Sequence, residues 1–190
     1  MDKKGKCIIF SAPSGAGKTT IVHKLLEERN DLAFSVSACS RSPRPNEIDG
    51  KDYHFLSVNE FKKKIDQEAF VEWEEVYKDH FYGTLKSEIE RIWNEGNTVV
   101  FDVDVYGGIS LKNYFGENAL SFFIAPPSLE VLEERLKFRN TETTEKIKTR
   151  LNKAEEELKL AKQFDLNVVN DNLEPTVKWI GHKINEFLSL

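Results

Sequence analysis

Short runs of consecutive apolar residues alternate along the chain with longer segments in which apolar residues recur at helical spacing. Largely apolar runs, in contrast to runs with apolar residues only at alternate positions, are typical of strands in a parallel sheet covered on both faces. The pattern therefore predicts an α/β fold around one parallel sheet. The predicted strands are CIIF at 7–10, TVVFDV at 98–103, LSFFI at 120–124 and LNVV at 166–169.

The segments between these runs predict amphipathic helices. The segment after the first strand carries one apolar stripe, and the last segment of the chain carries another. Pro175 marks the predicted start of the last helix, because proline is favoured in a first turn. The stripes consist of Ile21, Val22, Leu25 and Leu26 in the first helix, and of Val177, Ile180, Ile184 and Phe187 in the last.

Two segments interrupt this alternation and are interpreted as insertions. The first contains the turn-rich stretch RSPRPNEIDG, short aromatic runs and one helix, whose start at Ser57 is marked by Glu60 three residues later, a capping box. The second is a pair of charged helices. The predicted organisation is a core of residues 1–36, 86–127 and 162–190, with insertions at 37–85 and 128–161.

Composition restricts the possible partners and compartment. A net charge of -5 argues against a surface that binds nucleic acid, so an anionic ligand must be met by local arginines. Cys7 and Cys39 form neither a metal-ligand pair nor a disulfide framework. The apolar run near the start is too short for a signal peptide or a membrane span. We therefore expect a cytoplasmic protein that has no nucleic-acid or membrane partner.

The stretch SAPSGAGKTT, which follows the first strand, matches the P-loop spacing except that Ala12 stands where glycine is usual. Gly15 and Gly17 can adopt backbone angles that let successive N–H groups point at phosphate oxygens. In such a loop Lys18 reaches the β- and γ-phosphates and the Thr19 hydroxyl binds Mg²⁺. The alternative, a glycine-rich turn, is disfavoured because a strand and a helix flank the stretch.

Two acidic residues, Asp102 and Asp104, end the strand in VVFDVDVYGG. Since the carboxyl ends of parallel strands meet at one edge of a sheet, both carboxylates are expected to face the phosphate loop. Asp102 is predicted to support Mg²⁺ through a water molecule. Asp104 could instead serve as a cap at the end of the strand.

A phosphate loop by itself does not distinguish kinases from GTPases or mechanical ATPases. Residues 104–107 fit the DxxG pattern of GTPases, and NKAE at 152–155 superficially resembles their guanine-binding NKxD. The second match ends in glutamate and lies in a charged helical run, whereas that motif should follow a strand. We therefore interpret 152–155 as helix surface.

The first insertion contains groups suited to a second phosphate ester. Arg41 and Arg44 lie three residues apart on a turn stiffened by proline, and guanidinium groups bind phosphate oxygens bidentately. Tyr53 and Tyr82 can add phenolic donors. Singly, the arginines could be solvated loop charges and Tyr53 a partly buried core residue. Their combination favours a phosphate site separate from the loop.

Together these motifs resemble the guanylate kinase family, whose members phosphorylate GMP from ATP. The resemblance covers nearly the whole chain, and RSPRPNEIDGKDYHF is its most specific block. It implies a P-loop NTPase core with a parallel sheet covered by helices on both faces, an insertion that binds the nucleoside monophosphate, and a helical lid. The other matching stretches are SAPSGAGKTT, FVEWEEVY, FYGT, FDVDVYGG, IAPPSLEVLEERLKFRNTETTEKIKTRL and VVNDNLE.

The resemblance implies a GMP site in the first insertion. Guanine offers N1–H and an amino group as donors and O6 as an acceptor, which carboxylates and a hydroxyl complement. Such a site can discriminate against a wrong base by about 10⁴ to 10⁵. Glu72 could otherwise be an exposed strand carboxylate. The implied phosphate ligands are Arg41, Arg44, Tyr53 and Tyr82, and the implied guanine ligands are Ser37, Glu72, Thr84 and Asp104.

The resemblance also makes the second insertion a lid that closes on ATP. Its arginines would offset charge on the transferred phosphoryl group, although each could instead belong to a salt-bridged helix surface. Asn170 is expected to contact adenine or to be a turn residue. The implied catalytic residues are Lys18, Arg41, Arg139 and Arg150. The implied ATP-binding residues are Ser11, Ala12, Pro13, Ser14, Gly15, Ala16, Gly17, Lys18, Thr19, Thr20, Arg135 and Asn170.

The predicted function is a Mg²⁺-dependent kinase that transfers the γ-phosphoryl group of ATP to GMP and dGMP, giving ADP and GDP and supplying precursors of GTP and dGTP. Two alternatives remain open. A non-catalytic module that binds phosphorylated peptides is disfavoured by Lys18, Thr19 and the lid arginines. A kinase with another acceptor is disfavoured by Glu72, Thr84 and Asp104. The oligomeric state is left open.

Overall fold

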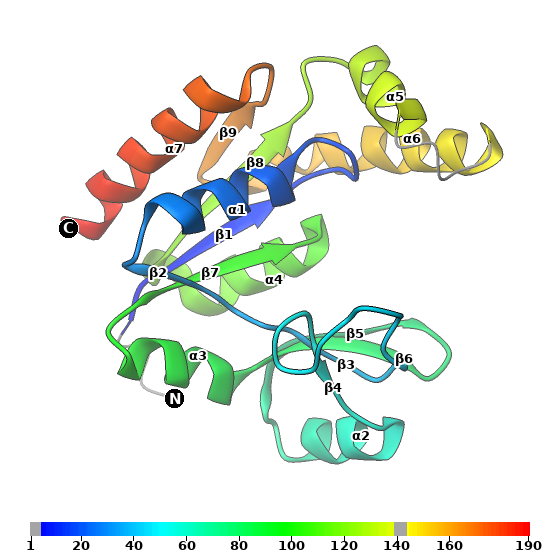
Figure 1. The fold of residues 1–190 in the computed structure, drawn as a ribbon, viewed down its shortest axis with the longest axis vertical. Helices are drawn as coiled ribbons and strands as arrows, with labels where there is room; N and C mark the ends of the chain where they lie inside the picture. Colours follow the sequence, from blue (N-terminus) through cyan, green and yellow to red (C-terminus); the bar gives the residue numbers. More distant parts are fainter. Residues whose placement is uncertain (1–4, 139–143) are drawn as a thin grey trace.

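The computed structural model describes residues 5–138 and 144–190 (Figure 1). Its core is a five-stranded parallel sheet in the order β2-β7-β1-β8-β9. The four predicted strands are confirmed, whereas β2 was not predicted because LAF is too short to form an apolar run. The strands are β1 (Cys7–Ser11), β2 (Leu32–Phe34), β7 (Thr98–Val103), β8 (Ala119–Ala125) and β9 (Leu166–Val169).

Helices cover both faces of this sheet, as predicted (Figure 1). Ile8 and Phe10 of β1 pack against α1 (Lys18–Glu28) and α7 (Leu173–Leu188). The alternate residues Cys7 and Ile9 belong to the opposite cluster, which includes α3 (Lys86–Asn94) and α4 (Val105–Phe115). Every residue of β1 is therefore buried, which explains its uninterrupted apolar run.

The last helix starts two residues before the predicted Pro175, at Leu173. Proline is tolerated there because the N–H groups of a first turn have no acceptor within the helix. Within the described parts of the chain, no helix is both long enough and apolar enough to cross a membrane.

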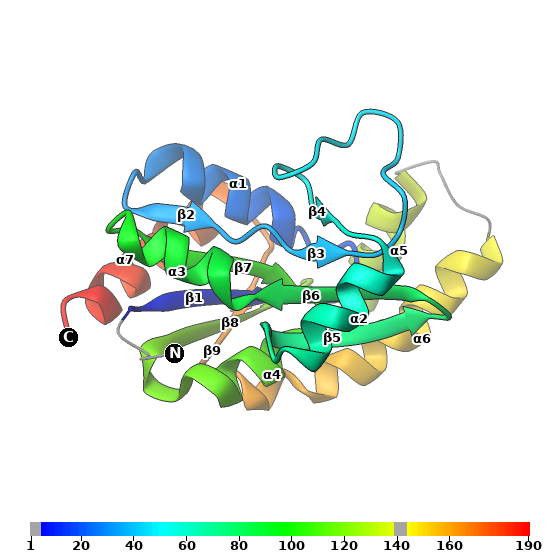
Figure 2. The same ribbon diagram turned by 90° about the horizontal axis from the view of Figure 1, so that it is seen from below.

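A second, four-stranded sheet in the order β4-β3-β6-β5 lies beside the core (Figure 2). Helix α2 (Val58–Asp66) packs on it through Phe61, whose ring stacks on Phe70 and Phe81. The predicted capping box is confirmed, since Ser57 and Glu60 bond each other's backbone N–H. The strands are β3 (Ala38–Cys39), β4 (His54–Phe55), β5 (Phe70–Tyr77) and β6 (His80–Leu85).

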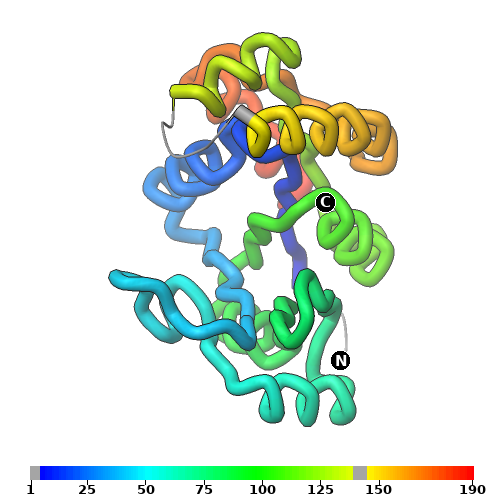
Figure 3. The backbone as a smooth tube through the Cα atoms, turned by 90° about the vertical axis from the view of Figure 1, so that its right-hand side faces the viewer, coloured from blue at the N-terminus to red at the C-terminus, as the bar shows by residue number. Residues whose placement is uncertain are grey.

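Helices α5 (Leu129–Phe138) and α6 (Thr144–Lys159) form a pair held by a small apolar cluster that includes Leu132, Leu136 and Ile147. Two short 3₁₀ helices, η1 (Gly116–Asn118) and η2 (Ala161–Gln163), precede β8 and β9. The α5–α6 pair and the second sheet lie on opposite sides of the core (Figure 3). The carboxyl ends of the core strands thus lie between two separate bodies.

Candidate active site

The loop between β1 and α1 turns at two glycines, Gly15 with φ of 98° and Gly17 with φ of 94°. Side chains with a Cβ rarely adopt these angles, so both positions require glycine. Ala12 is not among the residues with positive φ, and alanine therefore fits where the motif usually has glycine. A Cβ on Gly15 would lie 3.0 Å from both Leu132 and Leu136, so α5 packs directly on the loop.

A cavity of about 300 Å³ lies over this loop. Most of the predicted phosphate-binding residues line it, while Ser11 and Ala16 are buried. Charged residues of α6 enclose it from the other side. The lining residues are Ala12, Pro13, Ser14, Gly15, Gly17, Lys18, Thr19, Thr20, Asp104, Arg150, Lys153 and Glu157.

Asp102 contacts two residues of the loop, Lys18 and Thr19. Because β7 pairs with β1 in parallel, Asp102 lies opposite Phe10 at the carboxyl end of the sheet. Its carboxylate forms an ion pair with Lys18 and accepts a hydrogen bond of 2.8 Å from the Thr19 hydroxyl. Lys18 also donates to the carbonyl oxygen of Val103 at 2.6 Å. The predicted meeting of strand end and loop is therefore present.

These oxygens suit Mg²⁺, which prefers hard oxygen ligands and usually keeps several water molecules. Thr19 and Asp102 supply one hydroxyl and one carboxylate at the end of the loop. Across residues 5–138 and 144–190, no group of three or more histidine, cysteine or acidic side chains could hold a metal ion. The residues therefore fit Mg²⁺ that arrives with a nucleotide, since phosphate oxygens and water would complete the ligand set.

Two lid arginines contact the loop region. Arg135 donates to the carbonyl oxygens of Ala16 at 3.4 Å and Asn170 at 3.0 Å, and Arg150 donates to the Ser14 hydroxyl at 2.6 Å. The Asn170 amide in turn donates to Ala16 at 2.8 Å. These bonds place α5 and α6 against the phosphate loop. Arg139, the third predicted lid arginine, lies outside the described residues.

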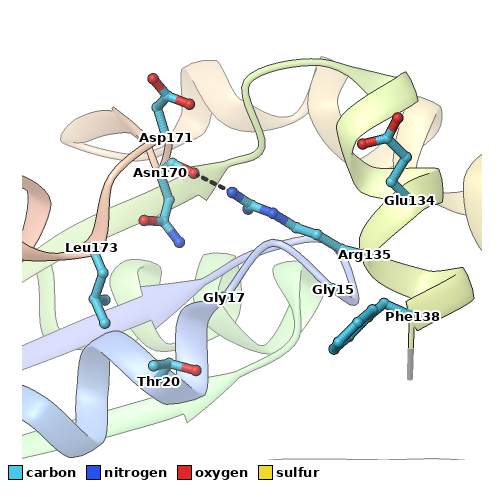
Figure 4. Close-up of a pocket in the computed structure, with 9 residues that line it drawn as sticks. All are labelled: Gly15, Gly17, Thr20, Glu134, Arg135, Phe138, Asn170, Asp171 and Leu173. Atoms are coloured by element: carbon cyan, nitrogen blue, oxygen red, sulfur yellow. Dashed lines mark hydrogen bonds between the residues drawn. The ribbon is translucent and has the colours of Figure 1, made fainter. Parts of the chain in front are cut away.

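A third group of residues surrounds a cavity of about 500 Å³ beside the loop (Figure 4). Asn170 is buried at its edge and follows β9 as the sequence indicated. Arg135, which the resemblance assigned to the ATP phosphates, lines this cavity together with Asn170, the residue expected to contact adenine. The full lining is Gly15, Gly17, Thr20, Glu134, Arg135, Phe138, Asn170, Asp171 and Leu173.

Another cavity of about 500 Å³ lies between the second sheet and the carboxyl end of β7. The predicted residues Ser37, Tyr53, Glu72, Tyr82 and Asp104 all line it, together with the aromatic side chains of Trp73 and Tyr106. Asp104 also lines the cavity over the phosphate loop, so the two spaces share a wall.

Glu72, which lines this cavity, is paired across the sheet with Thr84, which is not among the lining residues. Thr84 is buried on β6, and its hydroxyl donates to Glu72 Oε1 at 2.6 Å. Burial raises the pKa of Glu72, the nearby Asp104 raises it further, and the bond from Thr84 opposes the rise. A ligand that supplies N–H donors to this carboxylate would stabilise its charged form.

Asp104 is a cap, which was the structural alternative for this residue. Its side chain accepts a hydrogen bond of 2.8 Å from the Gly107 N–H at the start of α4. Its carbonyl oxygen accepts one of 2.9 Å from Ser11. Capping and lining the cavities are compatible, because the Gly107 N–H engages only one of the two carboxylate oxygens.

Arg41 contacts both predicted tyrosines, although neither it nor Arg44 is among the residues that line the second cavity. Its Nε donates to the Tyr82 hydroxyl at 3.2 Å, and its guanidinium lies 5.0 Å from the centre of the Tyr53 ring. Both terminal nitrogens donate to Glu47, which lowers the pKa of that carboxyl to about 2. Arg44 is exposed in the same turn, where its backbone N–H donates to Glu47 at 2.7 Å.

A sequence model described as guanylate kinase matches residues 4–187. The chain belongs to the guanylate kinase family. It is similar to the guanylate kinase of Porphyromonas gingivalis, with 51% identity over 185 residues that span 97% of this chain and 98% of that protein. It is 50% identical to the guanylate kinase of Salinibacter ruber over 182 residues, or 96% of each protein.

A solved guanylate kinase from Anaplasma phagocytophilum has the same fold, with a TM-score of 0.74 and 28% sequence identity over 96% of this chain and 85% of that one. The predicted family, enzyme class and P-loop fold are confirmed. The GTPase-like NKAE motif lies within α6, as its interpretation as helix surface required.

Sequence reasoning missed three charged residues of this candidate site. Glu47 follows Arg44 by three residues, a spacing that could have indicated a pair within the turn. Lys153 lies three residues, almost one helical turn, after Arg150 and lines the same cavity. Glu157 is 4% exposed, and its Oε1 lies 3.5 Å from Lys153 Nζ. Burial raises the pKa of Glu157, and nothing in the local sequence signals that burial.

Proposed function

We propose that this protein transfers the γ-phosphoryl group of ATP to GMP and dGMP, producing ADP and the nucleoside diphosphate. The observation that carries the proposal is the shared wall at Asp104 between the cavity over the phosphate loop and the cavity that contains Glu72. A donor on the loop and an acceptor in the second cavity would meet there. Family membership supports the same reaction.

In this proposal the phosphate loop, Ser11 to Thr20, binds the triphosphate of ATP. Lys18 exchanges its ion pair with Asp102 for the β- and γ-phosphates, because a phosphate carries more charge than a carboxylate. Thr19 and, through water, Asp102 would hold Mg²⁺, which would supply neutralisation of charge on these phosphates. Arg135 and Asn170 lie on the side where the nucleoside of ATP would extend.

The acceptor would bind with its phosphate on the arginine turn and its base in the second cavity. Arg41, Tyr53 and Tyr82 already contact one another, and Arg44 adds a further cation from the same turn. Glu72, Asp104 and the hydroxyls of Thr84 and Ser37 complement the guanine edge. Adenine would place an acceptor against a carboxylate, which leaves buried polar groups unpaired.

No general base is needed, since the second pKa of a phosphate monoester is about 6 and the acceptor is largely dianionic near neutral pH. Catalysis then rests on positioning and on charge supplied by Lys18, Arg41, Arg139 and Arg150. The bond from Arg150 to Ser14 supports this role, because it places the guanidinium beside the loop. An arginine in such a position is worth about 10³ to 10⁵ in rate in related reactions.

The domain boundaries follow from these roles. We assign residues 37–85 to GMP binding, 128–161 to a lid that excludes water, and 1–36, 86–127 and 162–190 to the core. We further propose that the reaction is cytoplasmic, in line with the two free cysteines Cys7 and Cys39, and that it supplies precursors of GTP and dGTP.

A coupled assay of ADP release tests the proposal, with GMP, dGMP, AMP and UMP as acceptors and a reaction without acceptor as control. We expect turnover with GMP and dGMP and little with AMP or UMP. Turnover that prefers a base other than guanine would refute the acceptor assignment. Binding of GMP with no ADP release would favour the non-catalytic module instead.

A further inference from the structure

Phe138, the last residue of α5, is 91% exposed although its side chain is a large apolar ring. The ring lines the cavity beside the phosphate loop, where Figure 4 shows it directed toward the loop near Gly15. A large exposed ring at the wall of a cavity gains by burial against a ligand. None of the roles derived above uses this residue.

The position of Phe138 is set by the packing of its helix. Leu132 and Leu136 press α5 onto Gly15, and Arg135 bonds the backbone of Ala16 on the same loop. Phe138 follows Arg135 by three residues, so the two side chains share a face of the helix. The ring is therefore carried by a helix anchored on the phosphate loop.

The cavity extends from the loop to Leu173 at the start of α7, across from Phe138 (Figure 4). Its volume of about 500 Å³ is in the range of small-molecule sites. Since its wall begins at Gly15, Gly17 and Thr20, a nucleotide whose phosphates bind the loop would carry its base into this space. The chemistry that fits is a planar aromatic base.

We infer that the Phe138 ring stacks on the adenine base of bound ATP and contributes to donor affinity. The inference rests on the proposed function in taking ATP as the nucleotide on the loop. Stacking on an aromatic ring tolerates different bases, because every base has a π-face. Phe138 therefore adds affinity for the base without selecting adenine over other purines.

The test measures binding of Mg·ATP and of Mg·tripolyphosphate, which has no base, by calorimetry in the absence of GMP. In Phe138→Ala we expect the Kd for ATP to rise by about 10-fold, within the range of one lost base–aromatic stack. The Kd for tripolyphosphate should stay unchanged. The Phe138→Trp variant, which keeps an aromatic ring, should bind ATP as tightly as the unmodified protein. The matched control is Lys137→Ala, which removes a neighbouring exposed side chain paired with Glu133.

Unchanged ATP affinity in a folded Phe138→Ala protein overturns the inference. So does an equal loss of affinity for ATP and tripolyphosphate, which would mean that the substitution disturbs the loop. Because the measurement omits GMP, its result is independent of the acceptor. A protein that binds ATP through Phe138 but fails to phosphorylate GMP would refute the proposed function and leave the stacking in place.

Discussion

Arg41 donates two parallel hydrogen bonds to the carboxylate of Glu47, at 2.6 and 2.7 Å. This bidentate geometry is also the one in which arginine binds phosphate. A guanidinium has five N–H donors, and bonds to Tyr82, Ser42 and Glu47 use four of them. Glu47 can therefore orient Arg41 while one N–H remains for a phosphate ester. The pair therefore suggests that Glu47 positions the proposed GMP-phosphate ligand.

The Glu47→Ala variant lacks the carboxylate that orients Arg41, so the guanidinium keeps its charge but loses its fixed position. The KM for GMP should therefore rise by about 10-fold. The KM for ATP should not change. Steady-state kinetics with each substrate varied in turn measure both values. Glu95→Ala, which breaks a surface pair with Arg91, is the control. A lower KM for GMP would show that Glu47 competes with the phosphate.

The same pair predicts an unusual titration. The ordinary glutamate pKa is 4.5, and the bonds from Arg41 lower that of Glu47 to about 2. Because the folded-state pKa is depressed, the pair stabilises the fold above pH 4.5, and this contribution is lost as the pH falls toward 2. A carbon-13 NMR titration of the Glu47 carboxyl checks this. A midpoint near 4.5 would mean that the pair does not persist in solution.

The pKa of Glu72 is shifted in the opposite direction from that of Glu47, because burial raises it. Protonation removes an acceptor for guanine, so GMP affinity should fall with decreasing pH, beginning above the ordinary value of 4.5. Glu72→Gln should raise the KM for GMP by about 10- to 100-fold, the effect of one lost hydrogen bond to a charged group, and should flatten this pH dependence. Equal losses in GMP and ATP binding would show that the guanine pocket lies elsewhere.

Asp102 should control the magnesium requirement. Because its carboxylate contacts both Lys18 and Thr19, Asp102→Asn should raise the Mg²⁺ concentration for half-maximal activity by about 10-fold or more, as loss of a supporting ligand does in other metal sites. Activity measured against Mg²⁺ concentration at saturating ATP gives the value. Asp31→Asn, which affects only a pair with Arg29, should leave it unchanged. An unaltered Mg²⁺ dependence in Asp102→Asn would exclude this role.

Alanine substitutions at two helical glycines should have opposite effects on the stability of the fold. A Cβ on Gly108 of α4 would overlap with the Ser11 hydroxyl and press on Phe164, so Gly108→Ala should destabilise the fold by about 2 kcal/mol and lower the Tm by about 4–8 °C. At Gly181 in α7 a Cβ would meet no heavy atom within 4 Å, so Gly181→Ala should stabilise by up to about 1 kcal/mol. Thermal unfolding measures both. Similar Tm values for the two variants would contradict the close approach of α4 to β1.

Several parts of the fold could be predicted because their causes are local. The runs of β1, β7, β8 and β9 are largely apolar, so strands of a covered parallel sheet could be predicted without knowledge of the neighbours, although β9 is only partly buried. The phosphate loop depends on glycines at fixed spacing, and the start of α2 on Ser57 and Glu60. Each of these signals lies within a few residues of the feature that it predicts.

Features that join distant parts of the chain were decided by packing. The bond from Thr84 to Glu72 requires the register between β5 and β6, and the link from Thr19 to Asp102 requires β7 to lie beside β1. The burial of Glu157 depends on how α6 docks, and so could not be predicted from its charged surroundings in the sequence. Local chemistry therefore indicated which groups bind nucleotides, whereas strand register and helix docking set which of those groups meet, because both are properties of the whole packed chain.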